Sequence, residues 1–225
     1  MTKQKQQQNL SKSRDGGYTI IESLVAMIVV SVLMIAIAPV MAFSVATRVQ
    51  ARRMELATQA ARTYIDALRT GAIVGPKPAG PAGLPAAVQA DKKFPTEVTG
   101  TVAEAPAPPK DISILYCIDL DGGGCTNTSN KDFVVQGGRK SSNPADPTAT
   151  GYELMVRVYR ADSFAADAPT LKGPDPNRSR QSIVGAGLGD RSVPVVEMTT
   201  QIPPTTQGGA SAYRSLCTRT NGNCK

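Results

Sequence analysis

The sequence predicts an α+β protein in which a long N-terminal helix packs on a small antiparallel β-sheet headgroup with long loops. From Ser23 to Thr47 no charged residue occurs, so 25 uncharged residues follow Glu22. From Arg48 to Thr70 apolar residues recur at spacings of three and four, as on one face of a helix. Beyond residue 110, several short segments alternate apolar and polar residues, as half-buried strands do.

The uncharged run is long enough to cross a bilayer as a helix, at about 1.5 Å per residue. Basic residues precede it in the first 14 positions, and such residues stay cytoplasmic. We therefore expect a single-pass inner-membrane protein with a cytoplasmic N-terminus, and everything after Thr47 outside. A secretory signal peptide is disfavoured, since its apolar region is only about 7–15 residues long and normally has no acid at its start. A plain signal anchor stays open.

Glu22 stands at the head of this apolar run. A charged side chain in hydrocarbon costs several kcal/mol unless it has a partner, so Glu22 is expected to have a specific one. A cut after Gly17 would create an amine on Tyr18, roughly one helical turn away, and a neighbouring copy could present that amine to Glu22. Pro39 interrupts the same run, and we expect a kink or local melting of the helix there.

These residues carry a family resemblance. A basic leader, Gly17, the residues Tyr18-Thr19-Ile20-Ile21-Glu22 and the apolar helix resemble the class III signal of type IV pilins and type II secretion pseudopilins. The resemblance implies cleavage after Gly17 and N-methylation of Tyr18 by an inner-membrane prepilin peptidase. It also implies assembly with other pilin-like subunits, on an inner-membrane platform, into a periplasmic or cell-surface filament. Pilins commonly carry a proline near the depth of Pro39, where the helix loosens in their filaments.

A finer resemblance is scattered further along the chain. Local strings look like the pseudopilin of the hormogonium polysaccharide secretion system of filamentous cyanobacteria, and they lie at residues 44–53, 55–61, 156–162 and 189–191. This resemblance implies a role in polysaccharide export that supports gliding motility, with the secreted polysaccharide as a candidate contact.

The expected organisation has five parts. Residues 1–17 form the cleaved leader, 18–47 the transmembrane and filament-core helix, 48–74 an amphipathic helix, 75–110 a Pro/Ala/Gly-rich connector, and 111–225 the antiparallel headgroup. The connector holds eight prolines and reads as an extended stretch that cannot fold alone. Strands are expected at 112–118, 133–136, 152–160 and 193–202, and surface loops at 137–150 and 165–191. In 152–160 we expect one buried face, with Leu154, Val156 and Val158 inward.

Composition limits the function classes. Gly and Pro together make up 37 residues, aromatic content is 4%, and Trp is absent, so the core is expected to be modest. The chain has no His, the usual base for a Ser or Cys nucleophile, and no carboxylate pair in a catalytic context, so we expect neither an enzyme nor a cofactor. The formal net charge of +7 is dispersed and partly lies in the leader, so nucleic acid is not an expected partner.

Four cysteines form two closely spaced pairs. Cys117 and Cys125 bracket seven residues, and Cys217 and Cys224 bracket six. Each spacing suits a local disulfide formed in an oxidising compartment. Two pairs of free thiols remain an alternative, whereas zinc is disfavoured because neither spacing is the two-residue gap of a zinc ribbon.

Two acidic residues give a weak calcium candidate. Asp119 and Asp121 alternate before Gly122, which is a fragment of a calcium loop. The acidic ligand that should close such a loop is absent, so we favour a tight turn spanned by the disulfide and expect no metal.

Arg48, Arg52 and Arg53 form a basic cluster just beyond the apolar run. It could contact anionic headgroups, polysaccharide or DNA, although solvated or filament-interface charges are the simpler interpretation. Two other functions stay open: a minor pilin that binds DNA or surfaces, and a membrane-anchored periplasmic protein that is never processed.

Overall fold

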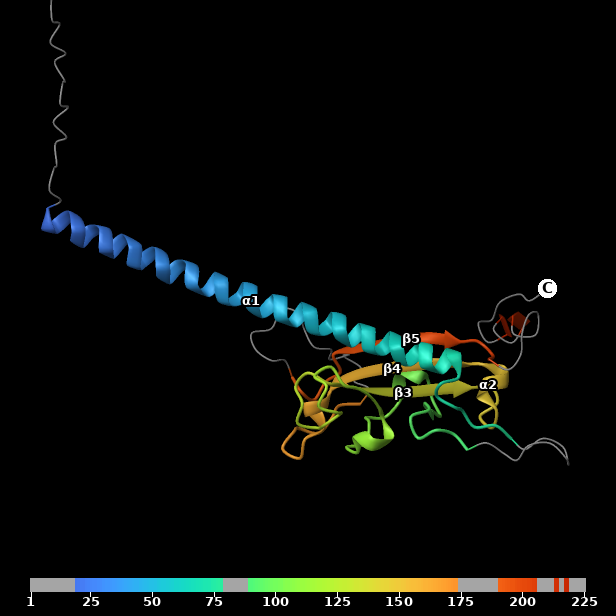
Figure 1. The fold of residues 1–225 in the computed structure, drawn as a ribbon. Coiled ribbons are helices and arrows are strands. Elements are labelled where there is room, and N and C mark those ends of the chain that lie inside the picture. The colour runs from blue at the N-terminus through green and yellow to red at the C-terminus, as the bar shows by residue number, and fades with distance from the viewer. Residues whose placement is uncertain (1–18, 79–88, 174–189, 206–212, 215–216, 219–225) are drawn as a thin grey trace, which may run out of the picture. The chain divides into compact units, whose positions relative to one another are not determined.

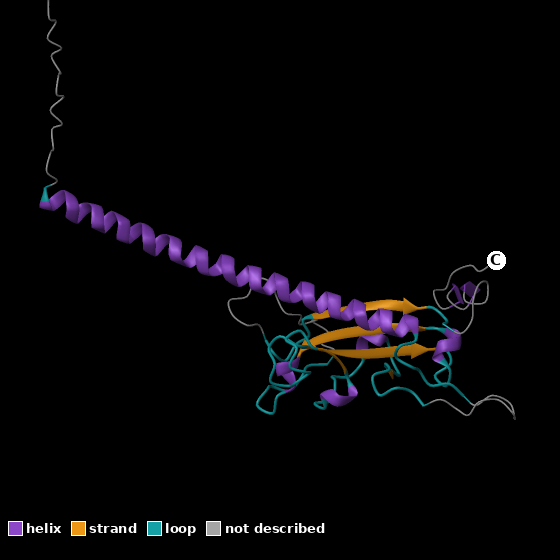
Figure 2. Cartoon of the chain, viewed as in Figure 1, coloured by secondary structure: helices purple, strands orange, loops and turns teal. Residues whose placement is uncertain are grey.

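The computed structural model describes residues 19–78, 89–173, 190–205, 213–214 and 217–218. The chain divides into two compact units, Met1–Val45 and Ala46–Lys225, and the division falls inside the helix α1. The elements, in chain order, are α1 (Ile20–Thr70), β1 (Thr96–Glu97), β2 (Tyr116–Ile118), β3 (Phe133–Ser141), α2 (Pro147–Thr150), β4 (Tyr152–Arg160) and β5 (Val196–Ile202) (Figures 1 and 2). Short 3-10 turns lie at Val102–Glu104, Ile112–Ile114 and Ala161–Phe164.

The sheet is mixed. β3 and β4 pair antiparallel over their full lengths, and β5 and β2 extend them antiparallel on either side. The short β1 pairs parallel with β3 at Gly138 and Arg139, so the expectation of a purely antiparallel sheet is wrong at this strand. A parallel pair needs a long crossover rather than a hairpin, and the chain between β1 and β3 is long enough to provide one.

The second half of α1 packs on one face of this sheet (Figure 1). Its small residues Ala57, Ala60 and Ala61 let the helix approach closely, and Tyr64 and Leu68 extend the same face. Opposite them lie inward residues of the strands: Val135, Leu154, Val156, Val158 and Ile202. The predicted α+β architecture, with an amphipathic helix packed on a small sheet, is therefore confirmed.

Glycines in β3 allow this close packing. A Cβ atom on Gly137 would overlap the hydroxyl of Tyr64 and lie 3.0 Å from two of its ring carbons. On the opposite face, a Cβ atom on Gly138 would lie 2.9 Å from the Cβ of Ala105 and 3.0 Å from Met155. The strand thus continues to Ser141, and the predicted loop at 137–150 begins too early because both glycines serve packing rather than a turn.

Both faces of β4 are buried, not one as predicted. Leu154, Val156 and Val158 face α1, whereas Met155 and Tyr159 belong to two smaller clusters on the other face. Residues that complete these clusters come from two segments outside the strands: Val98, Val102, Ala105, Ala161, Phe164 and Leu171. Residues 98–105 supply part of the two clusters that cover the second face of β4. The second half of the expected connector therefore contributes to the core, which its composition does not predict.

Arg157 points into this second layer with 1% of its surface exposed. Its guanidinium donates to the carbonyls of Ala105 and Ala103 at 2.6 and 2.9 Å and lies 3.4 Å from the carboxylate of Glu197. A buried cation needs such partners, so Arg157 ties the segment before β2 to the sheet.

Candidate functional site

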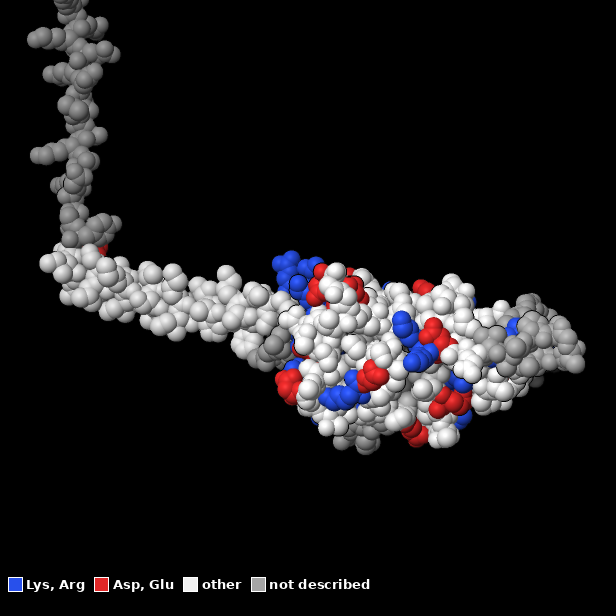
Figure 3. Space-filling view, turned by 60° about the horizontal axis from the view of Figure 1, so that its bottom comes forward, with Lys and Arg blue, Asp and Glu red and all other residues white. Residues whose placement is uncertain are grey.

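The first unit presents an almost wholly apolar surface, in which Glu22 is the one charged residue among those described. Every described residue from Thr19 to Val45 is exposed, including large side chains such as Ile20, Met27 and Ile35, which are 88%, 72% and 74% exposed. Figure 3 shows this stretch almost free of Lys, Arg, Asp and Glu, whereas both signs of charge mix on the visible face of the second unit. By length and composition α1 can cross a membrane. Apolar surface on this scale needs a non-aqueous partner.

Glu22 lies in the first turn of α1. Thr19 caps the helix, because its Oγ1 accepts from the backbone N–H of Glu22 at 3.3 Å. A Thr followed three residues later by Glu is the capping-box pattern, and an acid there also complements the helix dipole. The cap uses the backbone N–H of Glu22, and sequence reasoning overlooked this Thr19 pattern.

Pro39 lies inside α1, and the helix continues through it without interruption. Of the expected kink or local melting at Pro39, the melting is absent within Ile20–Thr70, and the kink stays a prediction. The loosening of the helix around Pro39 in an assembled filament stays a prediction.

The residues of the expected processing site, Gly17 and Tyr18, lie outside the described residues. Cleavage after Gly17 and methylation of Tyr18 stay predictions.

The first predicted disulfide is confirmed. Cys117 and Cys125 are bonded, with their Cα atoms 6.3 Å apart. Cys217 is also disulfide-bonded, but Cys224 lies outside the described residues, so the pairing of these two stays a prediction.

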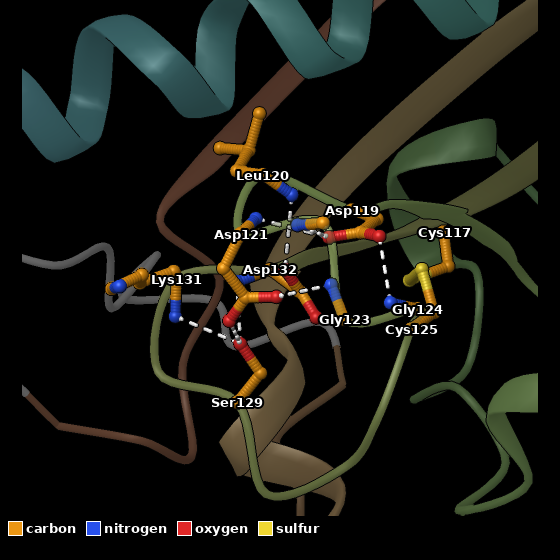
Figure 4. Close-up of a disulfide and its surroundings, with 11 residues drawn as sticks. Cys117, Asp119, Leu120, Asp121, Gly123, Gly124, Cys125, Ser129, Lys131 and Asp132 are labelled. Carbon is orange, nitrogen blue, oxygen red and sulfur yellow. Dashed lines mark hydrogen bonds between the residues drawn. A yellow bond between two sulfur atoms is a disulfide. The ribbon is translucent and has the colours of Figure 1, made fainter.

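The loop closed by Cys117 and Cys125 contains Asp119 and Asp121 (Figure 4). The carboxylate of Asp119 accepts from the backbone N–H groups of Gly124 and Gly122 at 2.8 and 2.7 Å. These bonds, with that from Gly124 the larger cause, lower the pKa of Asp119. The tight turn predicted here is confirmed, but a third carboxylate, Asp132, lies beside the first two and was missed.

Arg53 in the basic cluster is half-buried, and its environment differs from that of exposed Arg48 and Arg52. Partial burial lowers the pKa of Arg53, and neighbouring Arg160 lowers it further. Arg160 itself is ion-paired with Asp162. Arg53 thus belongs to the headgroup surface, which leaves Arg48 and Arg52 as the exposed members of the cluster.

Comparison with known families adds one finding. The model of the prokaryotic N-terminal methylation motif matches residues 12–38, a stretch that contains Gly17, Tyr18 and Glu22. The match supports a type IV pilin-like protein that a prepilin peptidase processes and that assembles with other pilins. Proteins of this kind are structural subunits rather than enzymes, and the motif with its apolar helix indicates membrane anchoring. No curated protein and no solved structure matches the chain.

Proposed function

We propose that this chain is a pseudopilin-like filament subunit. Prepilin peptidase cleaves it between Gly17 and Tyr18 and methylates the new amine. The apolar half of α1 then holds the subunit in the inner membrane, with its N-terminus on the cytoplasmic side, until an assembly platform moves it into a type IV pilus or type II secretion-like filament. The filament serves polysaccharide secretion and gliding motility.

The observation that carries this proposal is the fully exposed apolar surface of residues 20–45. Lipid can cover it while the subunit is stored in the membrane. After extraction from lipid, only other apolar surfaces can cover it, and the same helix in neighbouring subunits is the simplest source. A structural subunit that moves from membrane to filament needs a surface that both lipid and neighbouring helices can cover. A permanently anchored protein needs a surface that lipid alone covers.

Glu22 would set the register between subunits. In a core of packed apolar helices its carboxylate would be desolvated, and a buried unpaired charge is strongly destabilising. The amine of Tyr18 on an adjacent processed subunit is a cation of the right kind and comes from the same helix end. Pairing is complete only at one axial offset between neighbours, so it selects that offset.

The headgroup belongs outside the cytoplasm in this proposal. The disulfide between Cys117 and Cys125 supports that side of the membrane, because such bonds form and persist in oxidising compartments. The polysaccharide part rests on the resemblance of local strings, including residues 156–162, to a polysaccharide-secretion pseudopilin.

Two variants of Glu22 separate the charge of its side chain from a capping contact that this side chain could make with the Thr19 backbone. Glu22→Gln keeps a side chain that can complete the capping box but removes the charge, whereas Glu22→Ala removes both. Glu55→Gln is the matched control, because Glu55 is an exposed acid on the same helix beyond the apolar run. Each variant is expressed as the full chain in the strain that carries the gene, and the subunit is quantified in membranes and in sheared filaments.

We expect all three variants in the membrane at wild-type levels. Filament incorporation should fall at least tenfold for both Glu22 variants and stay unchanged for Glu55→Gln. Normal incorporation of Glu22→Gln would show that the charge does not set register.

The polysaccharide role has its own experiment. Deletion of the gene should abolish secreted polysaccharide, measured by lectin staining of the medium, and gliding should stop. The wild-type gene should restore both, and Glu22→Ala should restore neither. Unchanged secretion in the deletion strain would exclude this role and leave the filament role untouched.

A further inference from the structure

One row of polar side chains crosses three strands of the sheet. Lys140 of β3 pairs with Glu153 of β4, and Glu153 pairs with Gln201 of β5. Residues directly opposite each other on neighbouring strands point to the same face of a sheet, so these three side chains lie side by side. This is the face away from α1, because Met155, two positions after Glu153 in the same strand, belongs to a cluster on that face.

The row lines an open pocket at the end of that face. The pocket has a volume of about 350 Å³ and is lined by Lys140, Ser141, Ser142, Glu153 and Gln201. This volume is in the range of small-molecule sites, about 300–1,000 Å³. Most such sites are mainly apolar, whereas every residue that lines this one is polar or charged. The pocket therefore suits a small polar ligand.

The polar groups of the row leave bonding capacity unused. Lys140 and Glu153 are directly opposed, yet no ion pair joins them within the described part of the chain. The side-chain oxygen Oε1 of Gln201 is buried and accepts no hydrogen bond from any described residue. A buried polar atom without a partner is costly, and a ligand that donates to it removes that cost.

The charges and shapes of these groups select the ligand. One ammonium and one carboxylate give the pocket no net charge, so it lacks the excess of cations that binds phosphate or nucleic acid. It also lacks the aromatic and aliphatic walls in which peptide side chains anchor. Lys140 only donates, Glu153 only accepts, and the amide of Gln201 does both. Neighbouring hydroxyls of a sugar ring match this mixture, because each hydroxyl donates and accepts.

We propose that the pocket lined by Lys140, Glu153 and Gln201 binds one neutral sugar unit of a polysaccharide. The Glu153 carboxylate accepts from one ring hydroxyl, and the Lys140 ammonium donates to a neighbouring one. A further hydroxyl donates to Oε1 of Gln201. This inference deepens the polysaccharide role proposed above, and its biological meaning rests on that role.

The test uses the processed full-length chain in a detergent without a sugar headgroup, since a maltoside would compete for the pocket. Glucose, galactose and mannose are each titrated and followed by saturation-transfer difference NMR. We expect at least one of them to bind with a Kd of about 10⁻³ M, the strength of a small ligand held by a few hydrogen bonds. Glycylglycine and sodium phosphate at the same concentrations should not displace it.

Substitutions locate the bound sugar. Glu153→Gln removes the charged acceptor and should weaken binding at least tenfold, because hydrogen bonds to charged groups are the stronger ones. Gln201→Leu should weaken it about threefold to tenfold. Lys140→Gln changes an exposed residue, so it carries the test if the other two variants do not fold. Lys131→Gln is the matched control, because Lys131 is an exposed lysine just before β3 and outside the pocket.

Three results would overturn the site. These are no saturable signal with any of the three sugars, wild-type affinity in both Glu153→Gln and Lys140→Gln, and displacement of the sugar by glycylglycine or phosphate, which would indicate a peptide or an anion site. Deletion of the gene judges the polysaccharide role separately. Unchanged secretion in the deletion strain, with sugar binding that Glu153→Gln weakens, would leave the site standing and remove only that role.

Discussion

The contact between Tyr64 and Gly137 gives a sharp test of how the headgroup is held on α1. The Tyr64 ring has 1% of its surface exposed and lies 5.2 Å from the ring of Tyr116. Its hydroxyl donates to the carbonyl of Lys93 at 2.9 Å. Held on both sides, Tyr64 cannot move away from an added methyl group on Gly137, so Gly137→Ala should force the helix and the sheet apart.

The magnitude follows from three contributions. Overpacking costs about 1–3 kcal/mol, and disturbing the Tyr64 hydrogen bond costs about 1 kcal/mol. Ala gives the unfolded chain less conformational entropy than Gly, which stabilises the folded state by about 0.4–1 kcal/mol. The net loss is about 2 kcal/mol, which for a chain of this size lowers Tm by about 4–8 °C.

The assay is thermal unfolding of the processed full-length chain in detergent, followed by near-ultraviolet circular dichroism. Gly123→Ala is the matched control, because the nearest atom to its new Cβ would be the Asp121 carboxylate at 3.3 Å and its φ is not left-handed. Tyr64→Phe combined with Gly137→Ala should be about 1 kcal/mol more stable than the sum of the single changes, since the hydroxyl that clashes is gone. Strict additivity, or a Gly137→Ala variant as stable as wild type, would refute the packing argument.

Three further predictions concern stability. Replacing Cys117 and Cys125 together by Ser should cost about 2.5 kcal/mol on the chain-entropy estimate for a loop this short, measured by urea unfolding, and an unchanged midpoint would contradict it. Arg157→Ala should cost about 3 kcal/mol, because it leaves buried carbonyls and a carboxylate unpaired; a loss below 1 kcal/mol would show that water replaces the guanidinium. The pKa of Asp119 is lowered from 3.8 in the folded protein. Its ionised form therefore stabilises the fold above about pH 4, and this stabilisation is lost as the pH falls through the lowered pKa. Asp119→Asn should therefore be less stable than wild type at neutral pH and should lose less stability below pH 4 in acid titrations, whereas parallel curves would exclude this role.

Periodicity was enough to predict the helix and its buried face. The recurrence of Ala57, Ala60, Ala61, Tyr64 and Leu68 at spacings of three and four places them on one stripe, and that stripe is the buried one. The span of β4 was predicted equally well, because its alternating residues are bounded by Gly151 at one end.

The rest depends on contacts between distant residues. Gly137 and Gly138 signal a turn locally, but they extend β3 because side chains from α1 and from β4 occupy the space beside them. Arg157 reads as an exposed residue in an alternating strand, and it is buried because Ala103 and Ala105 bring carbonyls to it from more than 50 positions away.

The same limit applies to the candidate sites. Nothing in the sequence indicates that Asp132 lies beside Asp119, because only the register of the β2–β3 hairpin makes them neighbours. The role of Glu22 is the opposite case. Its position at the head of an uncharged run is visible in the sequence alone, although its Thr19 cap pattern went unnoticed.

The most direct test of the central claim is the intact mass of the native protein, measured separately from membranes and from sheared filaments. We predict that the filament form begins at Tyr18 and carries one methyl group on its amine, because that amine is the partner of Glu22. A filament form that still retains residues 1–17 would contradict the whole account of assembly.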